Sequence, residues 1–153
     1  MKGLMKWPLI IAAILVVLRV TSEQMGAPEA VNKIFGVTWL FFLVPFYFAF
    51  KIAATNDAHP YKTLFLKMAI FAALVRAMII PTYWLAYRFN WSAQRFSAEE
   101  GGVVGDAISP LSGYLLIPLS ALIAWVIAGT LIGGGLGSLV IAWKRRGVTE
   151  TPV

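Results

Sequence analysis

Four long apolar segments, separated by short polar stretches, dominate the pattern of hydrophobic and polar positions along the chain. They run from about residue 7 to 20, 34 to 54, 64 to 87 and 119 to 143. A helix of about 20 apolar residues is long enough to cross the hydrocarbon core of a bilayer. The pattern therefore predicts an all-α integral membrane protein with four transmembrane helices, folded as a single membrane domain over residues 1–153.

Three prolines indicate where these helices should deviate from straight α-helix. Pro45 and Pro81 lie inside the second and third segments, where a missing backbone N–H usually kinks a helix. The fourth apolar stretch begins near Leu111 and is too long for one upright span. We therefore expect Pro118 to divide it into an outer lead-in and the span proper.

The first apolar segment has the basic start and short apolar run of a signal peptide. For a cut after Ala27, however, the position three residues before the cut is Met25, which is not small. We therefore expect this segment to be a retained helix. Because the apolar run is short, we expect Arg19 to extend its side chain to the far interface.

The distribution of basic residues predicts an orientation. With the N-terminus placed in the cytoplasm, eight basic residues fall on the inner side and four on the outer side. The positive-inside rule favours this N-in/C-in topology, and we expect a multi-pass protein of a bacterial-type inner (cytoplasmic) membrane. The inner set is Lys2, Lys6, Lys51, Lys62, Lys67, Lys144, Arg145 and Arg146; the outer set is Arg19, Lys33, Arg88 and Arg95.

Composition agrees with this class and excludes several kinds of chemistry. The chain is 59% hydrophobic and 13% charged, whereas soluble domains are about 25% charged. It has no Cys, which excludes disulfides, thiolate metal sites and thiol catalysis, and its single His59 cannot alone provide a pair of haem ligands. From these counts we expect no metal or cofactor. The net charge of +6 comes from basic residues at helix ends, so it indicates topology and we expect no nucleic-acid partner.

Arg76 is the ionisable residue that lies deepest in a predicted span. It lies roughly 18 Å along the helix from Leu64, where an arginine costs about 2.5–3.5 kcal/mol. Its partner could be a carbonyl freed by a proline kink, a second subunit or a lipid headgroup; a substrate pathway usually needs more polar residues. Tyr83 and Tyr87 lie on roughly the same helical face, so we predict that all three contact a partner or a lipid.

Two further features indicate packing and docking. Gly129, Gly133 and Gly137 form a small-residue face for close helix packing, either against the chain's own helices or against another subunit. The outer loop over residues 89–110 is the longest non-apolar stretch, and we predict that it docks a partner. Its candidate docking residues are Trp91, Arg95, Glu99 and Glu100, although Ser97 and Glu100 also fit a helix-capping box.

The chain lacks the clustered His, Asp or Glu residues of small membrane enzymes, so we expect no catalytic activity. The leading hypothesis is a non-catalytic accessory or structural subunit of a larger multi-subunit membrane complex, such as an energy-converting one. Its expected partners are other membrane-protein subunits and membrane lipids. The alternatives are a small homo-oligomeric channel or transporter, or a module that binds a lipid, quinone or pigment.

Overall fold

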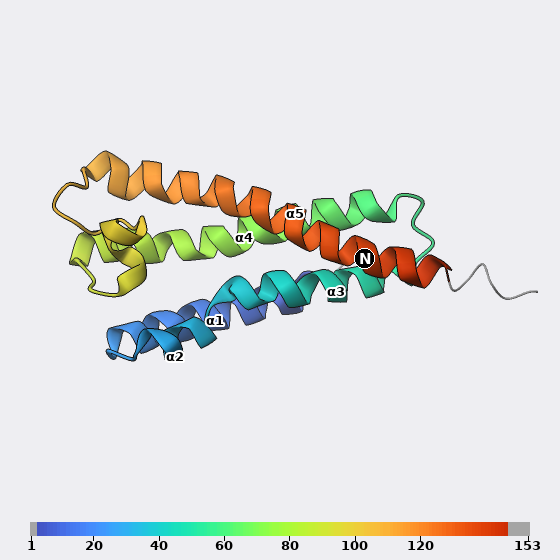
Figure 1. Cartoon of the computed structure of the whole chain (residues 1–153), viewed down its shortest axis with the longest axis horizontal. Coiled ribbons are helices and arrows are strands. Elements are labelled where there is room, and N and C mark those ends of the chain that lie inside the picture. Colours follow the sequence, from blue (N-terminus) through green and yellow to red (C-terminus); the bar gives the residue numbers. More distant parts are fainter. Residues whose placement is uncertain (1–2, 147–153) are drawn as a thin grey trace, which may run out of the picture.

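A computed structural model describes residues 3–146 and consists of antiparallel helices, with no β-strand in that part of the chain (Figure 1). Four helical stretches are long and apolar enough to cross a membrane, which confirms the all-α, four-helix prediction. Lys2 lies outside the described residues. The helices are α1 (Lys6–Gln24), α2 (Glu29–Ile34), α3 (Leu40–Ala53), α4 (Pro60–Phe89) and α5 (Ile117–Arg146), with short turns η1 (Val37–Trp39), η2 (Gln94–Phe96), η3 (Ala98–Glu100) and η4 (Ser112–Leu116).

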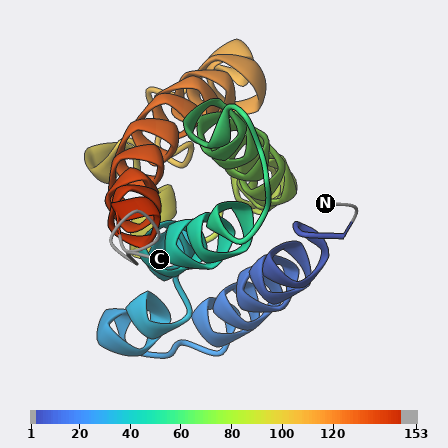
Figure 2. The same cartoon turned by 90° about the vertical axis from the view of Figure 1, so that its right-hand side faces the viewer.

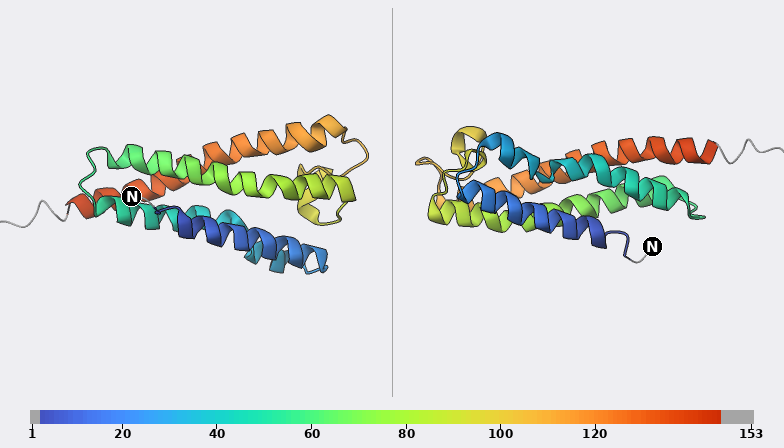
Figure 3. Two further views of the ribbon diagram at one scale, coloured as in Figure 1. Left: turned by 180° about the vertical axis from the view of Figure 1, so that it is seen from behind. Right: turned by 90° about the horizontal axis from the view of Figure 1, so that it is seen from below.

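Helices α3, α4 and α5 surround the main core, and α1 lies along the side of this group (Figure 2). Successive long helices run in opposite directions, so the segments that connect them lie at the two ends of the bundle (Figure 3). We call them the loop end, with residues 25–28 and 90–111, and the basic end, with the turn over residues 54–59. Arg145 Nη2 donates to the carbonyl of Asp57 at 2.8 Å, which joins the end of α5 to that turn.

The surface of the bundle is strongly apolar. Leu43, Leu131 and Leu139 each expose 63% or more of their area, and exposed Val, Ile and Phe side chains accompany them on all four long helices. A soluble monomer rarely presents so much contiguous apolar surface to water. The exposed side chains agree with the length and apolarity of the four helical stretches, which could cross a membrane.

The helical stretches extend beyond the apolar segments at both ends. The first runs to Gln24, and Arg19 pairs with Glu23 one turn later, near the end of this helix. The second begins at Glu29 and bends at Gly36, where a Cβ would lie 3.0 Å from the carbonyl oxygen of Lys33. The predicted segments are therefore the apolar centres of longer helices.

The predicted division of the fourth stretch at Pro118 is wrong. Residues Ser112–Leu116 form a π-helical turn that leads directly into α5, so the helical stretch runs without a break over Ser112–Arg146. Proline cannot donate to the carbonyl four residues earlier, here that of Tyr114. That carbonyl instead accepts the indole N–H of Trp84 on α4 at 2.8 Å. A tertiary hydrogen bond thus compensates for the proline and keeps the helix continuous.

Candidate functional site

A pocket of about 170 Å³ lies between the helices in the half of the bundle toward the loop end. Three arginines line it: Arg19 from α1, Arg76 from α4 and Arg95 from η2. The aromatic rings of Tyr83 and Trp125 line it as well. The remaining lining side chains are apolar apart from Thr38, and they are Val16, Val37, Phe41, Val75 and Ile79.

The guanidinium of Arg76 lies against two aromatic rings. Its Cζ is 5.3 Å from the centroid of Tyr83 and 5.9 Å from the centroid of Trp125. A desolvated cation–π contact is worth about 2 kcal/mol, so the two rings offset much of the cost of placing an arginine at this depth. Among residues 3–146 it has no carboxylate or carbonyl partner, so the first of the alternatives for Arg76, a carbonyl freed by a kink, is not provided by this part of the chain.

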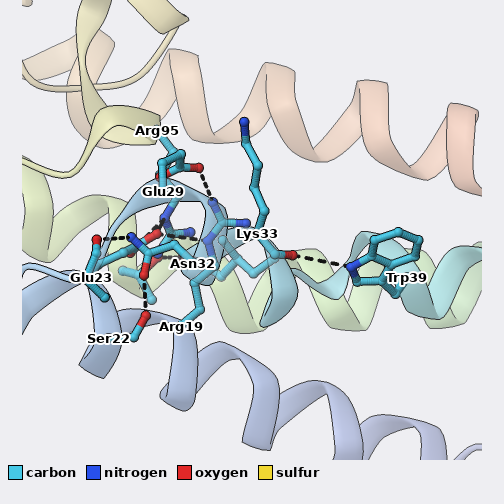
Figure 4. A network of polar contacts seen from close by, with 11 residues as sticks. Arg19, Ser22, Glu23, Glu29, Asn32, Lys33, Trp39 and Arg95 are labelled. Atoms are coloured by element: carbon cyan, nitrogen blue, oxygen red, sulfur yellow. Dashed lines mark hydrogen bonds and ion pairs between the residues drawn. The ribbon is translucent and has the colours of Figure 1, made fainter.

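The other two arginines share a buried carboxylate, that of Glu23 near the end of α1 (Figure 4). Arg19 Nε lies 2.9 Å from Oε1 of Glu23, and Arg95 Nε lies 2.8 Å from the same oxygen and 3.0 Å from Oε2. The Glu23 side chain is 0% exposed, so charge-assisted hydrogen bonds replace its lost hydration. Glu29 adds a longer contact of 3.5 Å to Arg19 Nη2.

The turn between α1 and α2 places these groups. Gly26 has a φ of +74°, which favours glycine, and it lets the chain reverse direction after α1. Asn32 then closes the turn: its Nδ2 donates to the carbonyl of Ala27 at 3.0 Å, and its Oδ1 accepts from the hydroxyl of Ser22. Helix α2 is thereby fixed beside the end of α1, which brings Glu29 to Arg19.

Arg95 is largely withdrawn from solvent. Its guanidinium lies 4.2 Å from the ring centroid of Phe96 and 6.0 Å from that of Tyr83. Burial lowers the pKa of Arg95 below its ordinary value, and the nearby carboxylate of Glu23 offsets only part of this shift. The buried Nη2 has no acceptor among the described residues, so this arginine retains unused hydrogen-bonding capacity.

The segment over residues 89–110 is a folded cap on the bundle. Backbone hydrogen bonds of 2.7 Å join Val104 to Phe96 and Ala98, and the side chains of Phe96 and Val103 are fully buried. Gly102 lies so close to Phe96 that a Cβ would be 2.2 Å from its backbone carbonyl. This packing holds Arg95 at the pocket and directs its side chain inward.

The fold of the cap places two of the four candidate docking residues inside and two on the surface. Arg95 and Trp91 face the interior, and the ring of Trp91 packs 5.7 Å from that of Phe96. Glu99 and Glu100 are exposed. The Ser97 hydroxyl accepts from the backbone N–H of Glu99 at 3.3 Å, so it caps η3 without the reciprocal contact of a capping box.

The structure brings Arg76 and Tyr83 together but places Tyr87 elsewhere. The Tyr87 hydroxyl donates to the carbonyl of Ile108 at 3.1 Å, and its ring meets that of Tyr114 edge-on at 4.8 Å. Sequence reasoning missed Glu23 and Trp125 as members of the site. An i, i+4 Arg–Glu pair at the end of an apolar helix was a usable signal for Glu23, but no local pattern indicated Trp125.

The glycine face of α5 packs within the chain. A Cβ on Gly129 would lie 2.5 Å from the Phe41 ring, and one on Gly137 would lie 2.7 Å from Leu64. A Cβ on Gly133 would lie closer still, 2.3 Å from the end of the Met68 side chain. Of the two alternatives for this face, the chain's own α3 and α4 are the partners in this structure.

The chemistry available at the pocket is that of cations, phenol, indole and one hydroxyl. The part of the chain that the structure describes holds no group of three His, Asp or Glu residues able to bind a metal ion. The arrangement can bind an anion through fixed guanidinium donors and can contact apolar groups through the surrounding side chains. Comparison of the chain with models of protein families, with curated proteins and with solved structures gave no match.

Proposed function

We propose that this protein is a multi-pass membrane protein that binds an anionic amphiphile in the arginine-lined pocket and catalyses no reaction. The observation that carries the proposal is the environment of Arg76. Its guanidinium lines a pocket, lies against two rings and has no anionic partner among residues 3–146. An anionic group in the pocket would provide the ion pair that the chain itself does not.

The balance of charge around the pocket favours a ligand with a single negative charge. Glu23 is shared between Arg19 and Arg95, and Glu29 adds a second carboxylate beside Arg19. These two carboxylates offset two of the three guanidinium charges. One positive charge remains, and it lies on the Arg76 side of the pocket, where a carboxylate or a phosphodiester would neutralise it.

The proposed setting is a bacterial-type cytoplasmic membrane with the loop end outside. The basic end carries lysines or arginines at the ends of α3 and α5 and the starts of α1 and α4, which the positive-inside rule assigns to the cytoplasm. The pocket then lies in the outer half of the bilayer. The apolar lining agrees with a ligand that resides in lipid.

Binding of dodecanoate tests the proposal. Calorimetric titration in dodecyl maltoside micelles should give saturable binding, and dodecanol, which has the same chain without the charge, should bind far more weakly. Arg76→Gln should weaken dodecanoate binding by about 10- to 100-fold, the value of one charge-assisted contact. Arg88→Gln is the matched control, since this arginine of α4 is exposed and does not line the pocket. Equal affinities in the two variants would contradict the proposal.

The accessory-subunit hypothesis stays a prediction. Two of the features that motivated it now have partners within the chain: the glycine face of α5 packs on α3 and α4, and Arg76 lies against Tyr83 and Trp125. The proposed binding function does not require a second protein. A membrane complex could still contain such a binding subunit, and its detection would require co-purification in mild detergent.

A further inference from the structure

A second hollow, of about 270 Å³ and almost entirely apolar, adjoins the arginine-lined pocket. It is a groove between α3 and α5, and we call it the α3–α5 groove. Thr38, Phe41 and Trp125 line both the pocket and the groove, so the two hollows meet at these side chains. From there the groove follows α5 as far as Ile132, roughly 10 Å toward the basic end.

We infer that the α3–α5 groove holds the alkyl chain of the amphiphile whose anionic head lies beside Arg76. The inference rests on the proposed function, which concerns the anionic head, and it adds where the alkyl chain of the same ligand binds. Polarity changes in the order that an amphiphile requires, from three guanidiniums in the pocket to apolar side chains along the groove. The direction also fits, since the groove leads from the loop end toward the middle of the bundle.

The size of the groove fits one chain. A cavity of about 150 Å³ accepts a benzene ring, so about 270 Å³ accommodates on the order of ten carbon atoms. Small residues make this space: Ala124 and Ala128 form its α5 wall, and Gly129 leaves room for the Phe41 ring at its base. An α-helix about 10 Å wide would not enter such a hollow, but a flexible chain would.

A series of carboxylates with chains of 4 to 16 carbons tests the inference. Each is titrated into wild type and into Ala128→Phe, which adds bulk at a residue that lines the groove but not the arginine-lined pocket. The ratio of the two dissociation constants cancels the partition of each probe into micelles. Gly135→Phe is the control, because this position on the same helix faces open space. Ala124→Leu, a smaller obstruction, covers the case in which Ala128→Phe fails to fold.

The expected ratio is near 1 for the four-carbon probe and rises to roughly tenfold for the 12-carbon probe, the loss expected when about two CH₂ groups of the chain are no longer buried. Gly135→Phe should give ratios near 1 throughout. Ratios near 1 for every chain length in both groove variants, with Arg76→Gln still weakening binding, would overturn the inference and leave the proposed function intact. Loss of the difference between Arg76→Gln and Arg88→Gln would instead overturn the proposed function.

Discussion

Replacing Glu23 by Gln removes one negative charge and leaves the shape of the side chain almost unchanged. Its carboxylate has 0% exposure and receives the Nε donors of Arg19 and Arg95 at 2.8–3.0 Å. The variant leaves these two guanidiniums close together without the anion between them. The contact between the end of α1 and the cap over residues 89–110 should therefore loosen, because Arg95 reaches α1 through Glu23.

The expected loss in free energy of unfolding is about 3 kcal/mol. Breaking one side of a buried ion pair usually costs about 3–5 kcal/mol. The lower figure applies here because the two arginines expose 19% and 17% of their side chains, so water recovers part of the lost solvation. Glu29→Gln should cost at most about 1 kcal/mol, because its contact is 3.5 Å long and 26% of its side chain is exposed.

Unfolding by dodecyl sulfate in mixed micelles, followed by circular dichroism, measures these differences. Glu99→Gln is the control for a change of charge on the same end of the bundle, since Glu99 is exposed and has no ion pair among the described residues. It should stay within about 0.5 kcal/mol of wild type. If Glu23→Gln is no less stable than Glu99→Gln, the buried network does not hold the cap in place and this reasoning is refuted.

Two other predictions concern the ends of the bundle. Gly102→Ala should destabilise the cap by about 1–3 kcal/mol and speed amide exchange over residues 89–110, because its Cβ would lie 2.2 Å from the Phe96 backbone. Gly135→Ala is the control, because Gly135 faces open space, and it should be neutral or stabilising by up to about 1 kcal/mol. If Gly102→Ala and Gly135→Ala change stability equally, the close approach of Gly102 to the Phe96 backbone does not matter for the cap. At the basic end, the Thr63 hydroxyl and a backbone N–H hold the pKa of Asp57 below its usual 3.8. The stability from Asp57 is therefore present above pH 3.8 and lost as the pH falls through the lowered pKa; Asp57→Asn should flatten the acid limb of an unfolding titration.

The four helices could be predicted from the sequence because hydropathy depends on composition over a window of residues. Their ends could not, because they depend on single contacts. Helix α1 continues past Arg19, which pairs with Glu23, and the stretch Ser112–Arg146 runs through Pro118 because Trp84 donates to the carbonyl of Tyr114. The i, i+4 spacing of Arg19 and Glu23 was a local signal for the first contact, whereas Trp84 and Tyr114 lie 30 residues apart and no local spacing indicates the second.

About half of the candidate site could likewise be predicted from the sequence. An arginine at the centre of an apolar helix predicts that something must stabilise it, and Tyr83 follows from helical periodicity. Trp125 lies on another helix, and the inward turn of Arg95 depends on how the cap folds around Gly102. Tyr87 shared the predicted face but lies one turn beyond the pocket, beside Tyr114. Periodicity assigns a face of a helix, whereas the position of a pocket along that face depends on the other helices.

The central claim is that Arg76 binds the anionic head of an amphiphile, and native mass spectrometry tests it most directly. Protein extracted from its membrane in a mild neutral detergent should carry one anionic amphiphile per chain. Arg76→Gln should lose this adduct, and Arg88→Gln should keep it. An adduct retained equally by both variants, or bound lipid in the same proportions as the surrounding membrane, would contradict the claim.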